Sequence, residues 1–128
     1  MRRRIFLDTG YLIALLRRKD ACHAAALEAA ASYTGPFVTT DLVLVELANS
    51  LSKPPYRKTV VAVIERIQAD SKTTVVPFTS RGMSQAFSLF KCREDKEWGL
   101  VDCFFSGYEG KEDKTRIDFR RSLSTSGF

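Results

Sequence analysis

Three carboxylates interrupt apolar segments at points where a charge is costly to bury. Asp8 stands between the apolar residues 5–7 and a second apolar run, Glu46 lies within "LVLVELANSL", and Asp102 lies within "WGLVDCFF". A buried charge needs hydrogen bonds, an opposite charge or a bound cation. These segments carry no comparable Lys or Arg partner. The three acids are therefore candidates for chemistry.

Convergence of these acids on one point would call for a cation. Carboxylates that lie close together repel one another unless a positive charge neutralises them. The chain has one histidine and three cysteines, so its ligand chemistry is mainly that of oxygen, which favours Mg²⁺ or Mn²⁺. Such ions activate water and stabilise charge on a phosphate during hydrolysis. The pattern indicates a metal-dependent nuclease.

Each acid also has a simpler structural interpretation. Asp8 can cap a helix that begins at Thr9 or Gly10, and taken alone this interpretation is favoured. Asp102 has so few polar neighbours that a functional role is favoured for it.

Glu46 is the most ambiguous of the three. On a helix it shares a face with Asn49 and Ser50, which makes a polar patch or, equally well, a solvent-exposed stripe. The opposite side of this helix is expected in the core, through Leu44, Leu47, Ala48 and Leu51.

Strand-like and helix-like segments alternate along the chain. Short β-rich runs predict strands at residues 5–7, 37–39 and 73–78. Helices are expected at residues 11–18, 21–32, 42–51, 56–69, 80–90 and 98–105, with Thr40 or Asp41 and Thr79 or Ser80 as caps. This alternation predicts an α/β fold with a largely parallel sheet. Ligands bind beyond the carboxyl ends of such strands, where Asp8 is expected.

Composition places the chain among globular proteins of one domain. It has 128 residues and no visible repeat, and its net charge of +5 with a pI near 9.3 weakly favours polyanionic partners. No apolar stretch is long enough to span a membrane, and the basic start lacks a signal-peptide pattern, so we expect a cytoplasmic protein. The odd cysteines, Cys22, Cys92 and Cys103, indicate reduced thiols, and His23 is expected on a helix surface.

The segments "IFLDTGYLIALL", "TTDLVLVELANSL" and "DKEWGLVDCFFS" closely resemble the three acidic motifs of PIN domains, particularly VapC-like ribonuclease toxins. The resemblance covers residues 4 to about 105. It implies a Rossmann-like α/β/α sandwich around a parallel sheet and Mg²⁺- or Mn²⁺-dependent endoribonuclease activity. Asp8, Glu46 and Asp102 match the family's catalytic, metal-binding acids, and Thr9 matches a hydroxyl residue that often follows the first acid.

The same resemblance implies partners. They are an RNA substrate, a cognate antitoxin protein and, often, a second copy of the chain. It implies no membrane partner.

The tail departs from the family pattern. We expect a PIN-like domain at residues 1–105 and a divergent tail at 106–128, without helical or strand periodicity and without the family's last strand. Asp118 lies at about the distance of the family's fourth acid, but its surroundings differ. One hypothesis is a shifted reading frame: suitable synonymous codons for 106–128, read one base out of phase, encode "QVMRERKIRQGLTFDGLYQQAG", which fits the family. Gene sequencing tests this hypothesis.

Two other functions compete with the nuclease. A catalytically silent PIN-like module that binds RNA or an antitoxin is favoured by the altered tail and opposed by the intact acids. A receiver-like signalling domain with Asp8 as phosphoacceptor is disfavoured, because no earlier acidic pair is present to hold its metal.

Overall fold

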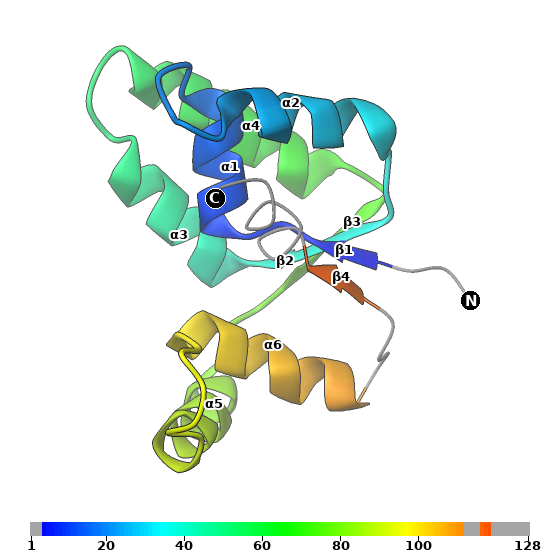
Figure 1. Cartoon of the computed structure of the whole chain (residues 1–128), viewed down its shortest axis with the longest axis vertical. Coiled ribbons are helices and arrows are strands. Elements are labelled where there is room, and N and C mark those ends of the chain that lie inside the picture. Colours follow the sequence, from blue (N-terminus) through cyan, green and yellow to red (C-terminus); the bar gives the residue numbers. More distant parts are fainter. Residues whose placement is uncertain (1–3, 112–115, 119–128) are drawn as a thin grey trace.

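The computed structural model describes residues 4–111 and 116–118, and within them strands alternate with helices (Figure 1). The elements are β1 (Arg4–Phe6), α1 (Thr9–Leu16), α2 (His23–Ser32), β2 (Phe37–Thr40), α3 (Asp41–Ser50), α4 (Tyr56–Ala69), β3 (Thr73–Val76), α5 (Ser80–Cys92), α6 (Leu100–Lys111) and β4 (Arg116–Asp118).

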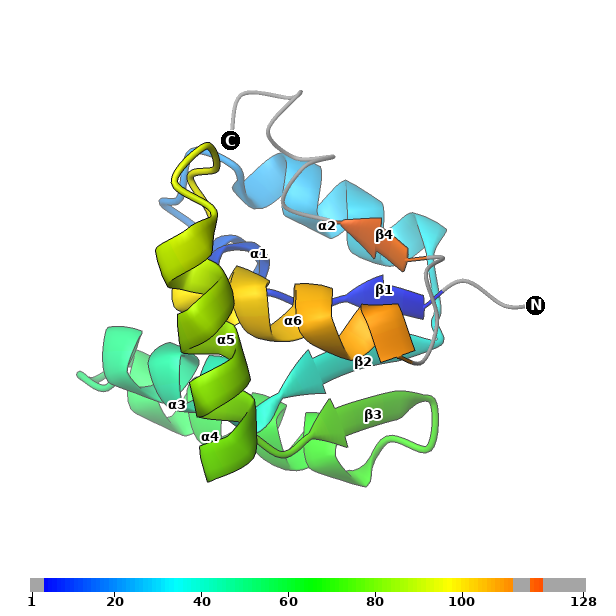
Figure 2. The ribbon, with the colours of Figure 1, turned by 90° about the horizontal axis from the view of Figure 1, so that it is seen from below.

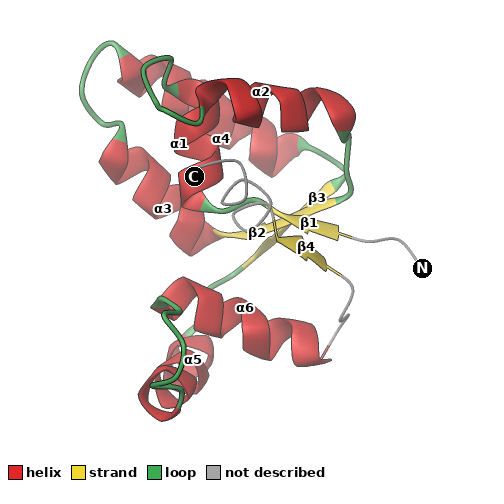
Figure 3. Ribbon diagram, viewed as in Figure 1, coloured by secondary structure: helices red, strands yellow, loops and turns green. Residues whose placement is uncertain are grey.

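The strands form a parallel sheet in the order β3-β2-β1-β4, covered by helices on both faces. Figures 2 and 3 show α1 to α4 gathered on one side of the sheet and α5 with α6 on the other. The expected α/β/α sandwich is confirmed. Because parallel strands end at the same edge, the segments that follow β1, β2 and β3 begin close to one another.

The apolar run after the basic N-terminal residues forms the centre of the core. Ile5, Phe6 and Leu7 are all buried, as expected for a strand covered on both faces. The ring of Phe6 contacts that of Phe105 at 4.2 Å between centroids, which attaches α6 to β1. The position of α6 on the sheet therefore depends on this aromatic pair.

Most predicted elements are present within a few residues of their expected bounds. The α4 helix has the predicted bounds, and α5 begins after Thr79, whose hydroxyl accepts a hydrogen bond from the Gly82 N–H at 3.0 Å. The predicted core side of α3 is confirmed for Leu44, Leu47 and Leu51, which are buried. Val43, three residues before Glu46, is also fully buried.

The structure corrects the expectation of a tail without helix or strand. The α6 helix continues beyond Phe105 to Lys111, and β4 forms an edge strand beside β1, with Asp118 opposite Phe6 in the register. A three-residue strand with two charged residues has no recognisable periodicity, so its pairing with β1 could not be seen locally. The predicted boundary at residue 105 and the shifted reading frame remain predictions, and most of 106–128 lies outside the described residues.

The cysteines and the histidine were also considered from the sequence, and only His23 differs from its expected position. Cys22, Cys92 and Cys103, all within the described residues, form no disulfide; Cys22 and Cys103 are buried and Cys92 is exposed. His23 is half-buried, and its Nδ1 lies 2.8 Å from the carbonyl oxygen of Ala14, so it links α2 to α1 instead of standing on the surface. None of the described helices has the length and apolar character needed to cross a membrane.

Candidate metal centre

Asp8 occupies the turn between the end of β1 and the start of α1. Its side chain is 2% exposed, and the backbone N–H of Tyr11 donates to its Oδ1 at 2.8 Å. Asp8 is thus the N-cap of α1, where a carboxylate satisfies an otherwise unpaired amide and interacts favourably with the helix dipole. The capping interpretation is correct, and it fixes this acid at the carboxyl edge of the sheet.

Glu46 lies in the middle of α3 and connects that helix to α1. The Thr9 hydroxyl donates to Oε1 of Glu46 at 3.2 Å. The Glu46 side chain is exposed, as are Asn49 and Ser50, so the solvent-exposed stripe is the correct description of this face. The hydrogen bond nevertheless joins two motifs that are 37 residues apart in the chain.

Asp102 is the third residue of α6. The backbone N–H of Gly99 donates to its Oδ2 at 3.0 Å, so this half-buried carboxylate closes the first turn of the helix. The predicted need for a hydrogen-bonding partner is therefore confirmed.

The Phe6–Phe105 contact indicates where Asp102 lies relative to Asp8. Asp102 precedes Phe105 by three residues, which is about one helical turn. Asp8 follows Phe6 by two residues, the spacing at which side chains along a strand return to the same face. Figure 2 shows that α6 begins at the edge where β1 leads into α1. The two acids therefore lie at the same edge of the sheet.

Thr39, Thr40 and Asp41 connect the strand ends at this edge through hydrogen bonds. Thr39 donates its hydroxyl to the Leu7 carbonyl oxygen at 2.9 Å, and Thr40 donates to the Val76 carbonyl oxygen at 2.7 Å; both are fully buried. The Phe78 N–H donates to Oδ1 of Asp41 at 2.9 Å. These hydrogen bonds, which the sequence analysis missed, cross-link the ends of three strands. The two consecutive threonines before Asp41 were a local signal for them.

The Cys103 thiol reports on the local electrostatics of α6. Burial raises the pKa of this thiol, and the negative charge of neighbouring Asp102 raises it further. Cys103 therefore remains a neutral core residue beside the candidate site and is unsuited to serve as a thiolate ligand.

The donor chemistry suits Mg²⁺ or Mn²⁺, because the candidate ligands are all carboxylates. The side chains do not form a ready-made cage: within residues 4–106, no group of three or more His, Cys, Asp and Glu side chains is placed to hold a metal ion. Asp8 and Asp102 each accept from a backbone amide, and Glu46 accepts from Thr9. Metal binding would thus require these three side chains to rotate away from the hydrogen bonds that they make in this structure.

Comparison with protein families decides the classification. The PIN domain family model matches residues 5–107, most of the chain. The chain belongs to the PIN domain family. This PIN domain contains all three acids of the candidate centre within the matched region, whereas Asp118 lies beyond it.

Solved structures of related proteins show the same fold. The Mycobacterium tuberculosis toxin VapC20, described as cleaving the sarcin-ricin loop, is 25% identical, with a TM-score of 0.75 over 97% of this chain and 95% of its own. The DNA-bound VapBC complex from Salmonella typhimurium is 18% identical, with a TM-score of 0.52 over 88% of this chain and 83% of its own. Comparison with curated protein sequences gave no match. The PIN family match over residues 5–107 argues against the receiver-like signalling domain considered from the sequence.

Proposed function

We propose that this PIN domain is a metal-dependent endoribonuclease of the toxin type, which hydrolyses phosphodiester bonds of RNA. The proposal is supported chiefly by the PIN family match, which spans Asp8, Glu46 and Asp102. The Thr9–Glu46 hydrogen bond and the Phe6–Phe105 contact support it further, because they join the elements that carry these acids. The similarity to VapC20, a toxin described as cleaving an RNA loop, supports the same substrate class.

In this proposal Asp8, Glu46 and Asp102 hold one Mg²⁺ or Mn²⁺ ion. When bound, the ion supplies an activated water and stabilises charge on the phosphate. Asp8 is the anchoring ligand, because it is buried and fixed to the start of α1. Thr9 orients Glu46 through its hydroxyl group, and the Phe6–Phe105 contact holds the helix that carries Asp102.

We further propose two protein partners. An antitoxin that binds and neutralises this chain is proposed from the resemblance of its motifs to those of VapC-like toxins. Association with a second copy of the chain is proposed from the family resemblance alone.

Manganese-dependent cleavage of a mixed RNA tests the proposal. We expect the wild-type chain to cleave and the Asp8→Asn variant to lose at least 100-fold in rate, on the order expected for removal of a metal ligand or its support. Glu46→Gln is expected to reduce the rate as well. Glu65→Gln is the matched control, because Glu65 is an exposed glutamate on α4, remote from this edge.

The silent module remains the second candidate, and one observation favours it. Each of the three acids already accepts a hydrogen bond from the protein, so none of them needs a metal ion to satisfy its carboxylate. A folded wild-type chain that neither cleaves RNA nor binds Mn²⁺ by titration calorimetry would support this candidate. Activity regained by a chain with the restored reading frame would then assign the loss to the tail.

A further inference from the structure

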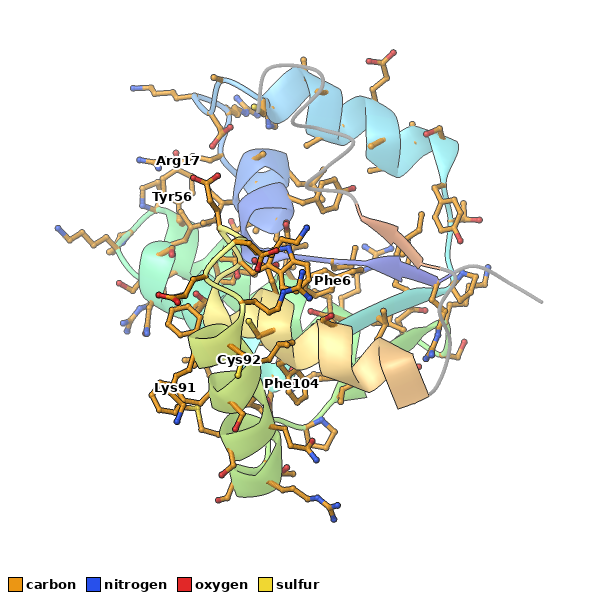
Figure 4. All side chains as sticks on the ribbon, turned by 60° about the horizontal axis from the view of Figure 1, so that its bottom comes forward. Phe6, Arg17, Tyr56, Lys91, Cys92 and Phe104 are labelled. Atoms are coloured by element: carbon orange, nitrogen blue, oxygen red, sulfur yellow. The ribbon has the colours of Figure 1, made fainter. Side chains whose placement is uncertain are left out.

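A polar pocket of about 400 Å³ lies at the far end of the α1–α3 pair from the Thr9–Glu46 contact. It is formed where α1 ends and where α3 leads into α4, and the side chains that matter are Arg17, Asn49, Ser50, Lys53 and Tyr56. Figure 4 shows Arg17 and Tyr56 close together, although they come from segments far apart in the chain.

The chemistry of this pocket suits an anion. Arg17 and Lys53 are exposed, and none of the described residues that line the pocket is acidic. Further exposed cations stand beside it in sequence: Arg18, Lys19, Arg57 and Lys58. The Arg57 Nε donates to the Ser52 carbonyl oxygen at 2.8 Å, which holds the loop that carries Lys53. Two exposed cations from separate segments, Arg17 and Lys53, are therefore brought to one pocket by the fold.

Its other groups suit a nucleotide in particular. Tyr56 is half-buried, so its ring is held in place while one side faces the pocket. Single-stranded nucleic acids bind where cations track the phosphates and aromatic rings stack with the bases. Asn49 and Ser50 add amide and hydroxyl groups that can hydrogen-bond to a base or sugar. An acidic peptide would use the cations but has no need of the ring.

The pocket and the candidate metal centre share two helices, α1 and α3. Asn49 and Ser50 follow Glu46 by three and four residues, so they lie on the same helix face about 5 Å further along α3. Arg17 follows Thr9 by eight residues, which places it about 12 Å along α1. An RNA strand held at Glu46 would reach this pocket within a few nucleotides.

We propose that this pocket is a substrate-binding subsite for single-stranded RNA. Arg17 and Lys53 bind phosphates a few nucleotides from the cleaved bond, and Tyr56 stacks with a base there. This inference rests on the proposed function and adds the direction in which the substrate leaves the metal centre, toward the C-terminal ends of α1 and α3.

Binding of a fluorescein-labelled, unstructured RNA of twelve nucleotides tests the proposal, by anisotropy in EDTA with increasing salt. We expect the Arg17→Gln/Lys53→Gln double variant to bind about tenfold more weakly at low salt. The slope of log affinity against log salt should shrink by about 1.4, since each phosphate contact on a single strand contributes about 0.7. Tyr56→Leu should weaken binding with an unchanged slope, and Tyr56→Phe should bind like the wild type.

The matched control is Lys72→Gln/Arg81→Gln, which removes the same charge from exposed side chains outside the pocket. An equal loss in both double variants, or an unchanged salt slope in the pocket variant, would overturn the proposal. So would a pocket variant that keeps RNA binding but loses binding to decaglutamate, which would assign the pocket to an acidic peptide. Because EDTA prevents metal-dependent cleavage, this result is independent of whether the chain proves to be a nuclease.

Discussion

At the scale of single residues, Asp8 combines two demands on one carboxylate. In the structure it caps α1, and in the proposed function it also binds a metal ion. The two roles have different requirements, because a cap needs only an oxygen that accepts from the Tyr11 amide, whereas a metal ligand needs the negative charge. Substitutions at this position can therefore separate stability from catalysis.

We expect Asp8→Ala to lower the free energy of unfolding by about 0.5–2 kcal/mol, because the cap is lost. Asp8→Asn should change it by only a few tenths, because Asn is an equally good N-cap, although it abolishes metal-dependent cleavage. Urea unfolding of both variants measures the difference. If Asn destabilises the chain as much as Ala, loss of activity in Asp8→Asn would report unfolding and could not be attributed to the metal site.

At the scale of elements, α5 and α6 pack closely against each other where Gly82 meets Phe104. Gly82, in the first turn of α5, is buried beneath Phe104, whose ring also packs edge-on against Phe78 at 5.0 Å between centroids. A Cβ atom at Gly82 would lie 2.7 Å from Cε1 of Phe104, closer than atoms can approach. The glycine is therefore required by this close approach between the helices.

We expect Gly82→Ala to destabilise the chain by about 1–3 kcal/mol through this clash, reduced by up to about 1 kcal/mol from the higher helix propensity of Ala. In a Phe104→Leu background the same substitution should be much less harmful, because the smaller side chain leaves room. A double-mutant cycle by urea unfolding measures this coupling. Equal effects in the two backgrounds would show that the clash is not the cause.

At the scale of the whole molecule, alkaline pH should weaken the fold through buried acids that are neutral in the native state. Burial and the charge of Asp102 raise the pKa of the Cys103 thiol above its ordinary 9.0, and burial raises the pKa of Tyr11 above 10.0. In the unfolded chain these groups ionise at their ordinary values. Above pH 9 the unfolded state therefore holds fewer protons than the native state, and stability falls as pH rises.

Unfolding free energies measured from pH 8 to 10 test this expectation. The Cys103→Ala variant should show a shallower decline than the wild type, although it is less stable overall. Cys92→Ala is the control, because Cys92 is exposed and its removal should leave the slope unchanged. A decline as steep in Cys103→Ala as in the wild type would assign the alkaline sensitivity to other groups.

Local sequence patterns predicted most of the helices and strands and identified three acids as candidates for a functional site. Residues 56–69 follow two prolines, Pro54 and Pro55, and the predicted bounds agree with α4 because such start signals act within one segment. The acids at 8, 46 and 102 were conspicuous because a charge inside an apolar run needs a partner wherever it folds. Their roles in catalysis remain a proposal that the experiments above address.

Only the tertiary structure decided which segments meet. The pairing of β4 with β1, the Thr9–Glu46 hydrogen bond and the pocket shared by Arg17 and Tyr56 each join segments distant in the chain. Such contacts depend on how strands order themselves in the sheet and how helices pack on it, and periodicity within a segment carries no information on either. The sequence by itself thus determined the elements and the acids, while packing of the elements decided which of these residues become neighbours.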